Sequence, residues 1–243
     1  MRLPFWRSIT RQRIRASPPP DVRKRLAALR VRARQRARED RSVSSGLFSL
    51  ARFVAMDLET TGPNMHADRI ISIGGVAVVG RTVRHRDAFE VVVRQKRESQ
   101  VDNILIHQIG GQEQRAGEEP VGALLSFLEF LDGSVAVAFR AEFDETVLRR
   151  ELREYLGIRT HLRFLDLASV LPALFPNTPN DSLDDWTAHF GLPPIGRHHA
   201  IADAYAGAQL LLLALEQSQR LGLQTAGDLL DLQGSQRWLG RRR

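Results

Sequence analysis

The order of the apolar segments constrains the fold of this chain more than any other feature. Three short runs with the length and composition of β-strands come first, at residues 52–58, 69–79 and 82–94. Two more strand-like runs, at residues 134–139 and 163–167, then alternate with helical periodicity at residues 117–131, 142–156, 182–190 and 200–215. Strands that are grouped first and alternate with helices later predict an α/β domain, with a mixed five-stranded sheet flanked by helices on both faces.

Length and composition fit one such domain with appendages. The chain has 243 residues, of which 43% are hydrophobic, enough to bury the core of a single domain. We predict a basic N-terminal arm or helix with its linker at residues 1–46, a main domain at 47–220 and a C-terminal extension at 221–243. Good helix formers at residues 21–39 follow three prolines, and the linker is expected at residues 42–46.

The sequence contains no cysteine. It therefore has no disulfide framework, no thiolate zinc site and no cysteine nucleophile, and a reducing cytoplasm is the expected location. The unbroken apolar run at residues 210–215 ends at Glu216 and is far shorter than the ~18 residues that a membrane-spanning helix requires. We predict a soluble protein with no membrane partner.

Positive charge is concentrated at the N-terminal end. Residues 1–46 contain 14 Lys/Arg and 3 Asp/Glu, a net charge of +11, whereas the remainder has 21 basic and 25 acidic residues, a net charge of −4. A basic arm of this kind favours contact with nucleic-acid phosphates. Two alternatives stay open. No acidic residue precedes Asp21, as in an organellar transit peptide, and the chain prefers arginine throughout, with 33 Arg to 2 Lys.

A first acidic pair stands at the end of the first strand-like run. Asp57 and Glu59 are two residues apart, and the turn residues 61–64 follow directly. Residues two apart on a strand project to the same face, so the two carboxylates are expected to lie side by side. Such carboxylates raise each other's pKa unless a cation neutralises them. The pair therefore indicates a metal or a shared proton rather than a solvated strand end.

Two further segments place an aspartate near the beginning of a predicted helix. Asp144 lies in the first turn of the helix at residues 142–156, where an Asp can also simply favour the positive end of the helix dipole. Asp203 lies in the first turns of the last helix, and His198 precedes it by five residues. A histidine at a helix start is disfavoured as a cation and suits proton acceptance. His199, four residues before Asp203, is the rival.

Taken in order, these segments resemble the motifs of the DEDD family of 3′-to-5′ exonucleases, in the histidine-containing subfamily that includes the proofreading subunit of bacterial DNA polymerase III. The resemblance covers residues 50–215. The first motif, residues 57–62, matches closely, and residues 71–76, 105–107 and 164–166 are similar to further family features. In the third motif, the five-residue spacing of the family favours His198 over His199.

The middle motif departs from the family pattern. Where the family usually has His-Asn-Ala-x-Phe-Asp, this chain has Phe139-Arg140-Ala141-Glu142-Phe143-Asp144. The metal-binding Asp144 is retained, whereas the changed pair lines the site near the substrate in the family. Rate or substrate preference is therefore expected to differ, and Arg140 is a candidate for contact with a phosphate.

The resemblance also implies a fold and a mechanism. It implies a ribonuclease-H-like sheet that carries at one edge the metal ligands Asp57, Glu59, Asp144 and Asp203. Oxygen ligands without cysteine favour Mg²⁺ or Mn²⁺, and two such ions ~3.5–4 Å apart activate water and stabilise the leaving 3′-oxygen. His198 would take the proton of the attacking water. Thr60 and Thr61 lie where family members grip the terminal nucleotide.

These features predict a metal-dependent 3′-to-5′ exonuclease that releases nucleoside 5′-monophosphates from DNA with a single-stranded or frayed 3′ end. An exoribonuclease or short-oligonucleotide hydrolase is one alternative, because no spacing in the sequence exposes the contacts that recognise a 2′-hydroxyl. A catalytically silent nucleic-acid-binding or polymerase-associated module is another, which the altered Phe139-Arg140 pair would suit. A DNA polymerase subunit is accordingly a candidate partner.

Overall fold

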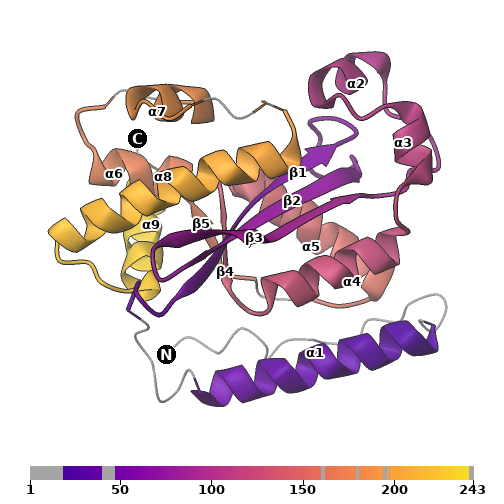
Figure 1. Cartoon of the computed structure of the whole chain (residues 1–243), viewed down its shortest axis with the longest axis horizontal. Helices are drawn as coiled ribbons and strands as arrows, with labels where there is room; N and C mark the ends of the chain where they lie inside the picture. The colour runs from indigo at the N-terminus through magenta and orange to yellow at the C-terminus, as the bar shows by residue number, and fades with distance from the viewer. Residues whose placement is uncertain are drawn as a thin grey trace.

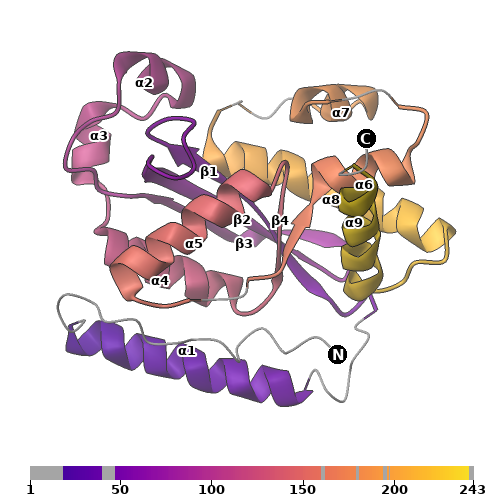
Figure 2. The same cartoon turned by 180° about the vertical axis from the view of Figure 1, so that it is seen from behind.

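The computed structural model describes residues 19–39, 47–159, 162–178, 181–193, 196 and 198–240. The linker expected at residues 42–46 and the first 18 residues lie outside this part of the chain. Within the described residues, one sheet runs through the middle of the molecule and helices cover both of its faces (Figure 1 and Figure 2).

The sheet has the strand order β3-β2-β1-β4-β5. Its strands are β1 (Arg52–Thr60), β2 (Ile70–Val79), β3 (Thr82–Val92), β4 (Val135–Ala138) and β5 (Phe164–Asp166). β2 pairs antiparallel with β1 and β3, whereas β4 pairs parallel with β1 and β5. Gly80 and Arg81 join β2 to β3 with φ angles of 55° and 65°, as a tight two-residue hairpin turn requires. The predicted mixed five-stranded sheet is confirmed.

The helices surround this sheet. They are α1 (Pro20–Glu39), α2 (Val101–His107), α3 (Gly111–Ala116), α4 (Pro120–Leu131), α5 (Glu142–Leu156), α6 (Leu167–Leu174), α7 (Leu183–His189), α8 (Ala200–Arg220) and α9 (Ala226–Gly240). α8 lies along one face, and α4 and α5 lie along the other, as the two opposite views show (Figure 1 and Figure 2). Among the described helices, none is both long and apolar enough to cross a membrane.

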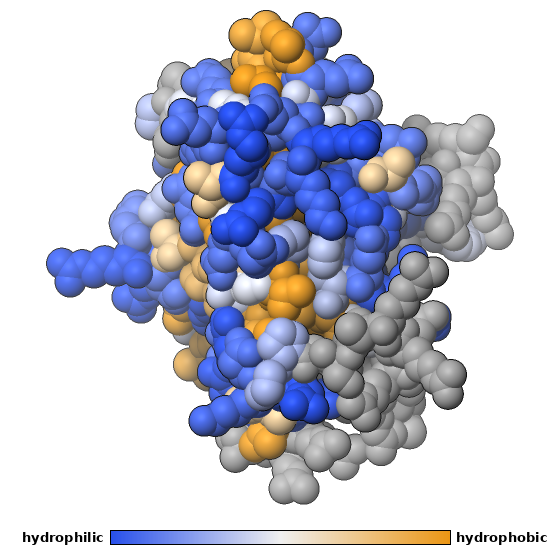
Figure 3. Space-filling view, turned by 90° about the vertical axis from the view of Figure 1, so that its right-hand side faces the viewer, coloured by the Kyte–Doolittle hydropathy of each residue, from blue (hydrophilic) through white to orange (hydrophobic). Residues whose placement is uncertain are grey.

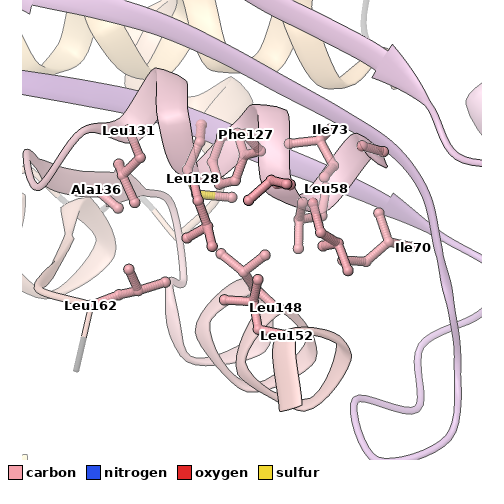
Figure 4. Packing of buried hydrophobic residues seen from close by; sticks show 14 of the residues in the cluster. Leu58, Ile70, Ile73, Phe127, Leu128, Leu131, Ala136, Leu148, Leu152 and Leu162 are labelled. Carbon is pink, nitrogen blue, oxygen red and sulfur yellow. The ribbon is translucent and has the colours of Figure 1, made fainter. Parts of the chain in front are cut away.

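Side-chain alternation along β1 divides the core into two layers. Val54 and Met56 pack in the layer that contains α4 and α5, and Figure 4 shows part of it, with Leu58 of β1 near Ile73 of β2. Phe53 and Ala55 point the other way, into the layer that contains α6, α7 and α8. Burial of both faces explains why β1 is apolar at nearly every position before Asp57.

α1 packs against the outside of α4. Val22, Leu26 and Leu29 are buried in the α4 layer of the core. Arg25 makes a bidentate ion pair with Glu129 of α4, with N···O distances of 3.0 and 2.8 Å. The described part of the N-terminal segment is therefore a helix docked on the domain, one of the two forms that the sequence allowed.

α9 closes the edge of the sheet at β5. The backbone N–H of Asp166 donates to Gln233 Oε1 at 2.6 Å, and Gln233 Nε2 donates to the carbonyl oxygen of Phe164 at 3.2 Å. One buried amide side chain thus supplies the donor and acceptor that a neighbouring strand would offer. Leu229 of α9 is fully buried in the α8 layer.

The helix and strand boundaries differ from the sequence prediction in a few places. β1 continues to Thr60, α4 begins at Pro120 instead of residue 117, and α8 continues to Arg220 instead of residue 215. Pro120 starts α4 because its fixed φ suits the first helical position and its missing N–H has no partner to lose there.

Candidate active site

The alternation that builds the core also places the first acidic pair. Asp57 and Glu59 continue the Phe53 and Ala55 series and so project to the face that α8 covers. β4 ends at Ala138 and pairs with β1 only up to Ala55. The two carboxylates therefore stand at the carboxyl end of β1, beyond the end of β4, where no strand of the described residues pairs with β1 on that side.

α8 brings the third carboxylate to the same place. The helix begins at Ala200 with His199 at its N-cap position, and the N–H of Asp203 donates to the carbonyl oxygen of His199 at 3.0 Å. Asp203 is buried. Ligand oxygens of Asp57, Glu59 and Asp203 all lie within 4.8 Å of one another. Residues almost 150 positions apart in the sequence thus form one cluster.

Asp144 lies beside this cluster rather than within that group of three. It sits in the first turn of α5 and is buried. Its pKa is raised to about 7, chiefly by burial and to a smaller extent by the charges of Glu59 and Asp166, while hydrogen bonds with the backbone of Asp144 and of Leu58 oppose the rise. The contact with Leu58 places the carboxyl group against β1, between Asp57 and Glu59.

Asp166 is a further acidic residue near the site that motif spacing alone did not single out. It ends β5 and caps α6, accepting hydrogen bonds from the N–H of Ala168 at 3.1 Å and from Ser169 Oγ at 2.7 Å. Arg237 of α9 lies 3.7 Å from its carboxylate. The only signal in the sequence was the likeness of residues 164–166 to a family feature, because α9 was not foreseen.

The two histidines before α8 have different surroundings. His198 is exposed and has a φ of 62°, immediately before the extended N-cap residue His199. His199 is half-buried. The pKa of the nearby His107 of α2 is lowered, mainly by the burial of His107 and to a smaller extent by the charge of His199. His199 thus lies near α2, and His198 is the more exposed of the two histidines.

The loop after β1 uses both threonines that were expected to contact substrate. Thr60 Oγ1 donates to the carbonyl oxygen of Gly62 at 2.7 Å. Thr61 Oγ1 donates to Asp68 at 2.9 Å and accepts from the N–H of Arg69 at 3.0 Å. Their hydroxyl hydrogens hold the loop in shape, so the hydroxyl groups could contact a substrate only as hydrogen-bond acceptors.

The altered pair before Asp144 also has a structural role. Phe139 packs against the α8 layer of the core. Arg140 has a φ of 57°, and its Nη2 donates to the carbonyl oxygen of Asp181 at 3.0 Å, just before the N-cap of α7. Arg140 thus ties the end of β4 to the segment that leads into α7.

The chemistry of the cluster fits a hard divalent cation. Its donors are carboxylate oxygens, and the chain has no cysteine that would select a softer metal. The pKa of the Asp144 carboxyl group is raised first by burial and then by its acidic neighbours, and a bound cation would neutralise these charges.

A family model described as "Exonuclease" matches residues 54–211. A PolC-type DNA polymerase III of Thermotoga maritima is 30% identical over 181 residues, which are 72% of this chain and 13% of that protein. A DNA polymerase III subunit epsilon-like protein of Rhodobacter capsulatus is 32% identical over 73% of this chain and 26% of its own length. The chain thus spans a small part of these relatives.

A shorter relative is covered more fully. The DNA polymerase III subunit epsilon of Aquifex aeolicus is 23% identical over 172 residues, which are 68% of this chain and 81% of that protein. Among solved structures, E. coli exonuclease I in complex with a dT13 oligonucleotide has a TM-score of 0.62 at 20% identity, over 70% of this chain and 42% of that one. The zinc-bound exonuclease I complex with single-stranded DNA has a TM-score of 0.63. These likenesses show the predicted ribonuclease-H-like fold.

Proposed function

We propose that this chain, which belongs to the exonuclease family, is a metal-dependent 3′-to-5′ exonuclease that hydrolyses phosphodiester bonds at DNA 3′ ends and releases nucleoside 5′-monophosphates. The convergence of oxygens from Asp57, Glu59 and Asp203 within 4.8 Å, with Asp144 alongside, is the observation that carries this proposal. Such a cluster of carboxylates is electrostatically costly unless it binds cations.

The four carboxylates would hold two Mg²⁺ or Mn²⁺ ions. When bound, the ions would activate a water molecule and stabilise the leaving 3′-oxygen of the phosphodiester. Asp57 is suited to the central position, because it lies on the rigid middle strand with Glu59 on the same face and Asp203 opposite. Asp144 completes the set from the side of β1 that faces α5.

His198 is our candidate for the general base. It accepts a proton from the attacking water, which makes that water a better nucleophile. Its exposure suits this role, since a base that works on each turnover must return its proton to solvent. His199 is the weaker candidate because it neighbours His107.

The surroundings of the cluster suit a single-stranded DNA terminus. Asn103 Nδ2 donates to the carbonyl oxygen of Thr60 at 2.6 Å and thereby fastens α2 to the end of β1. Val101, Leu105 and Ile106 of α2 are exposed, and apolar surface stands out at the top of the view onto this side of the molecule (Figure 3). Unstacked bases present faces that can pack on apolar side chains of this kind. Thr60 and Thr61 remain our candidates for contact with the terminal nucleotide.

A gel assay with matched oligonucleotides tests this proposal. DNA and RNA of one sequence, each labelled at the 5′ end, are incubated with the protein and Mg²⁺, Mn²⁺ or a chelator. We expect a ladder that shortens from the 3′ end on DNA and only when metal is present. Faster degradation of RNA would instead favour an exoribonuclease, and full-length oligonucleotides under every condition would favour a silent nucleic-acid-binding module.

Association with a DNA polymerase is a further part of the proposal. It is supported by relatives named as PolC-type polymerases and epsilon subunits of DNA polymerase III. The predicted cytoplasmic location rests on the absence of cysteine from the sequence.

A further inference from the structure

We infer that Gly74 of β2 is a positioning residue of the proposed metal site, because only a residue without a side chain lets the start of α8 reach the carboxylates of β1. This inference rests on the proposed function. Gly74 has no ligand atom itself, but it would determine the distance between the ligands on β1 and the ligand on α8.

Gly74 lies beside Asp57 on the neighbouring strand and against the start of α8. In the register of the sheet, it is the partner of Asp57 on the neighbouring strand, so a side chain there would project to the same face as the Asp57 carboxylate. A Cβ atom at Gly74 would lie 2.1 Å from the carbonyl carbon of Ala200 and 2.3 Å from the backbone nitrogen of Ile201. These atoms form the first turn of α8, and backbone atoms cannot rotate away as the end of a flexible side chain can.

The requirement is for space and not for an unusual backbone conformation. Gly74 has no positive φ, unlike the turn glycine Gly80. An alanine could therefore adopt the backbone angles of Gly74 without strain, and its whole effect would be to push α8 away from the sheet. Relieving the overlap would need a retreat of roughly 1 Å at the start of the helix.

Such a shift of α8 matters because the distances between the carboxylate oxygens must stay within the range that one metal ion can bridge. Mg²⁺ binds oxygen at ~2.1 Å, so two oxygens on one ion lie no more than ~4.2 Å apart. The oxygens of Asp57, Glu59 and Asp203 lie within 4.8 Å of one another, so a shift of the helix start by about 1 Å is large compared with their spacing. Asp203 is in the first turn of α8 and has a short side chain, so it moves with the helix start, as does His198 just before it.

The next residue on the strand offers a matched control. Gly75 is the partner of Met56 and faces the opposite layer, where a Cβ atom would lie 2.9 Å from the ring of Phe130. Substitution there strains the core without touching α8. Farther along α8, Gly207 has room, since a Cβ atom there would meet Leu167 and Ala55 only at 3.9 and 4.0 Å.

The test measures Mn²⁺ binding to full-length Gly74→Ala, Gly75→Ala and Gly207→Ala proteins by the loss of the free-Mn²⁺ signal in electron paramagnetic resonance. Thermal unfolding of each metal-free protein reports the strain. We expect Gly74→Ala to bind Mn²⁺ at least ~10-fold more weakly than the wild type does. Gly75→Ala should bind Mn²⁺ within twofold of the wild type, even if its Tm falls as much as that of Gly74→Ala. Gly207→Ala should match the wild type in both measurements.

Mn²⁺ affinity within twofold of the wild type in folded Gly74→Ala would overturn the inference. If Gly74→Ala does not fold, Ala204→Val replaces it in the test, because it enlarges a buried side chain under the same turns of α8. Mn²⁺ affinity of folded Ala204→Val within twofold of the wild type would likewise overturn the inference. Wild-type protein that binds no Mn²⁺ would instead refute the proposed function, so the two failures are distinguishable.

Discussion

At the scale of single residues, Asp144 shows the conflict between stability and activity. Its carboxyl group is buried, and its pKa is raised to about 7, first by burial and then by Glu59 and Asp166. An acid whose pKa is higher in the folded than in the unfolded protein stabilises the fold at low pH, and this stabilisation is lost as the pH rises through the folded pKa. Metal-free protein should therefore be less stable at pH 8 than near pH 5, as far as this residue is concerned.

Asp144→Asn removes that buried charge while keeping an acceptor for the hydrogen bond to β1. We expect the free energy of unfolding of the metal-free protein at pH 8 to rise by roughly 1–3 kcal/mol, with the gain shrinking as the pH falls toward 4. Nuclease activity should fall sharply in the same variant, because a ligand is lost. Denaturant melts at several pH values check the first part, and a variant less stable than the wild type at pH 8 would refute it.

His198→Ala separates proton transfer from metal binding. The side chain lies outside the group of clustered oxygens, so Mn²⁺ affinity should stay within a few-fold of the wild type. Hydrolysis should slow by about 10²–10⁴, the usual contribution of a general base. His199→Ala is the control and should retain most of its activity. A larger loss of activity in His199→Ala than in His198→Ala would identify His199, and not His198, as the general base.

Sequence reasoning reached some of these residues and not others. The two-residue spacing of Asp57 and Glu59 was enough to put them on one face, because strand geometry has a fixed period. The approach of Asp203 to that pair depends on how closely α8 can lie on β2, which is decided by Gly74 and cannot be read from spacing. Asp166 was reached only through a weak likeness, since its partner Arg237 belongs to a helix that the pattern did not reveal.

At the scale of elements, the helices with a clear apolar stripe were predicted and the irregular ones were missed. α2 and α3 have only 7 and 6 residues, too few to show a helical period. α6 contains Pro172 and follows β5 without a turn. α9 contains two internal glycines, and contacts with β5 and α6 stabilise it more than its own sequence does.

The contact between α9 and β5 gives a prediction at this scale. Gln233→Ala would leave the N–H of Asp166 and the carbonyl group of Phe164 without their partner, which should cost about 1–3 kcal/mol of unfolding free energy. Gln236→Ala, on the same helix but only half-buried, should cost less than ~0.5 kcal/mol. Equal denaturation midpoints for the two variants would contradict the proposed role of Gln233.

At the scale of the whole molecule, charge is divided between a basic N-terminal segment and an acidic remainder that holds the carboxylate cluster. The helix in the basic segment is docked on α4, and Figure 1 shows it on the opposite side of the molecule from α2 and α7. A nucleic acid that reached both the cluster and α1 would have to pass around the domain. Contact of the basic segment with phosphates would therefore add affinity at a distance from the cleaved bond.

Deletion of residues 1–46 tests this contribution. We expect weaker binding to DNA and a flatter dependence of log Kd on log salt concentration, because fewer counterions are released. The truncated protein loses the buried face of α1, so its unfolding must be measured alongside. Charge reversal at the exposed Arg23 and Lys24 in the full chain removes positive charge but keeps the buried face of α1, and it should also flatten the salt dependence. An unchanged salt slope in both variants would favour a role for this segment in targeting or scaffolding.

We propose above all that the carboxylate cluster on β1 and α8 removes nucleotides from a DNA 3′ end with the help of a divalent metal. Nucleotide release by wild-type and Asp57→Ala proteins, each with Mg²⁺ and with a chelator, tests it most directly, provided that circular dichroism shows both proteins to be folded. We predict that the wild type with Mg²⁺ releases nucleoside 5′-monophosphates and that the other three reactions release none. Full activity of Asp57→Ala, or of the wild type with chelator, would contradict the assignment.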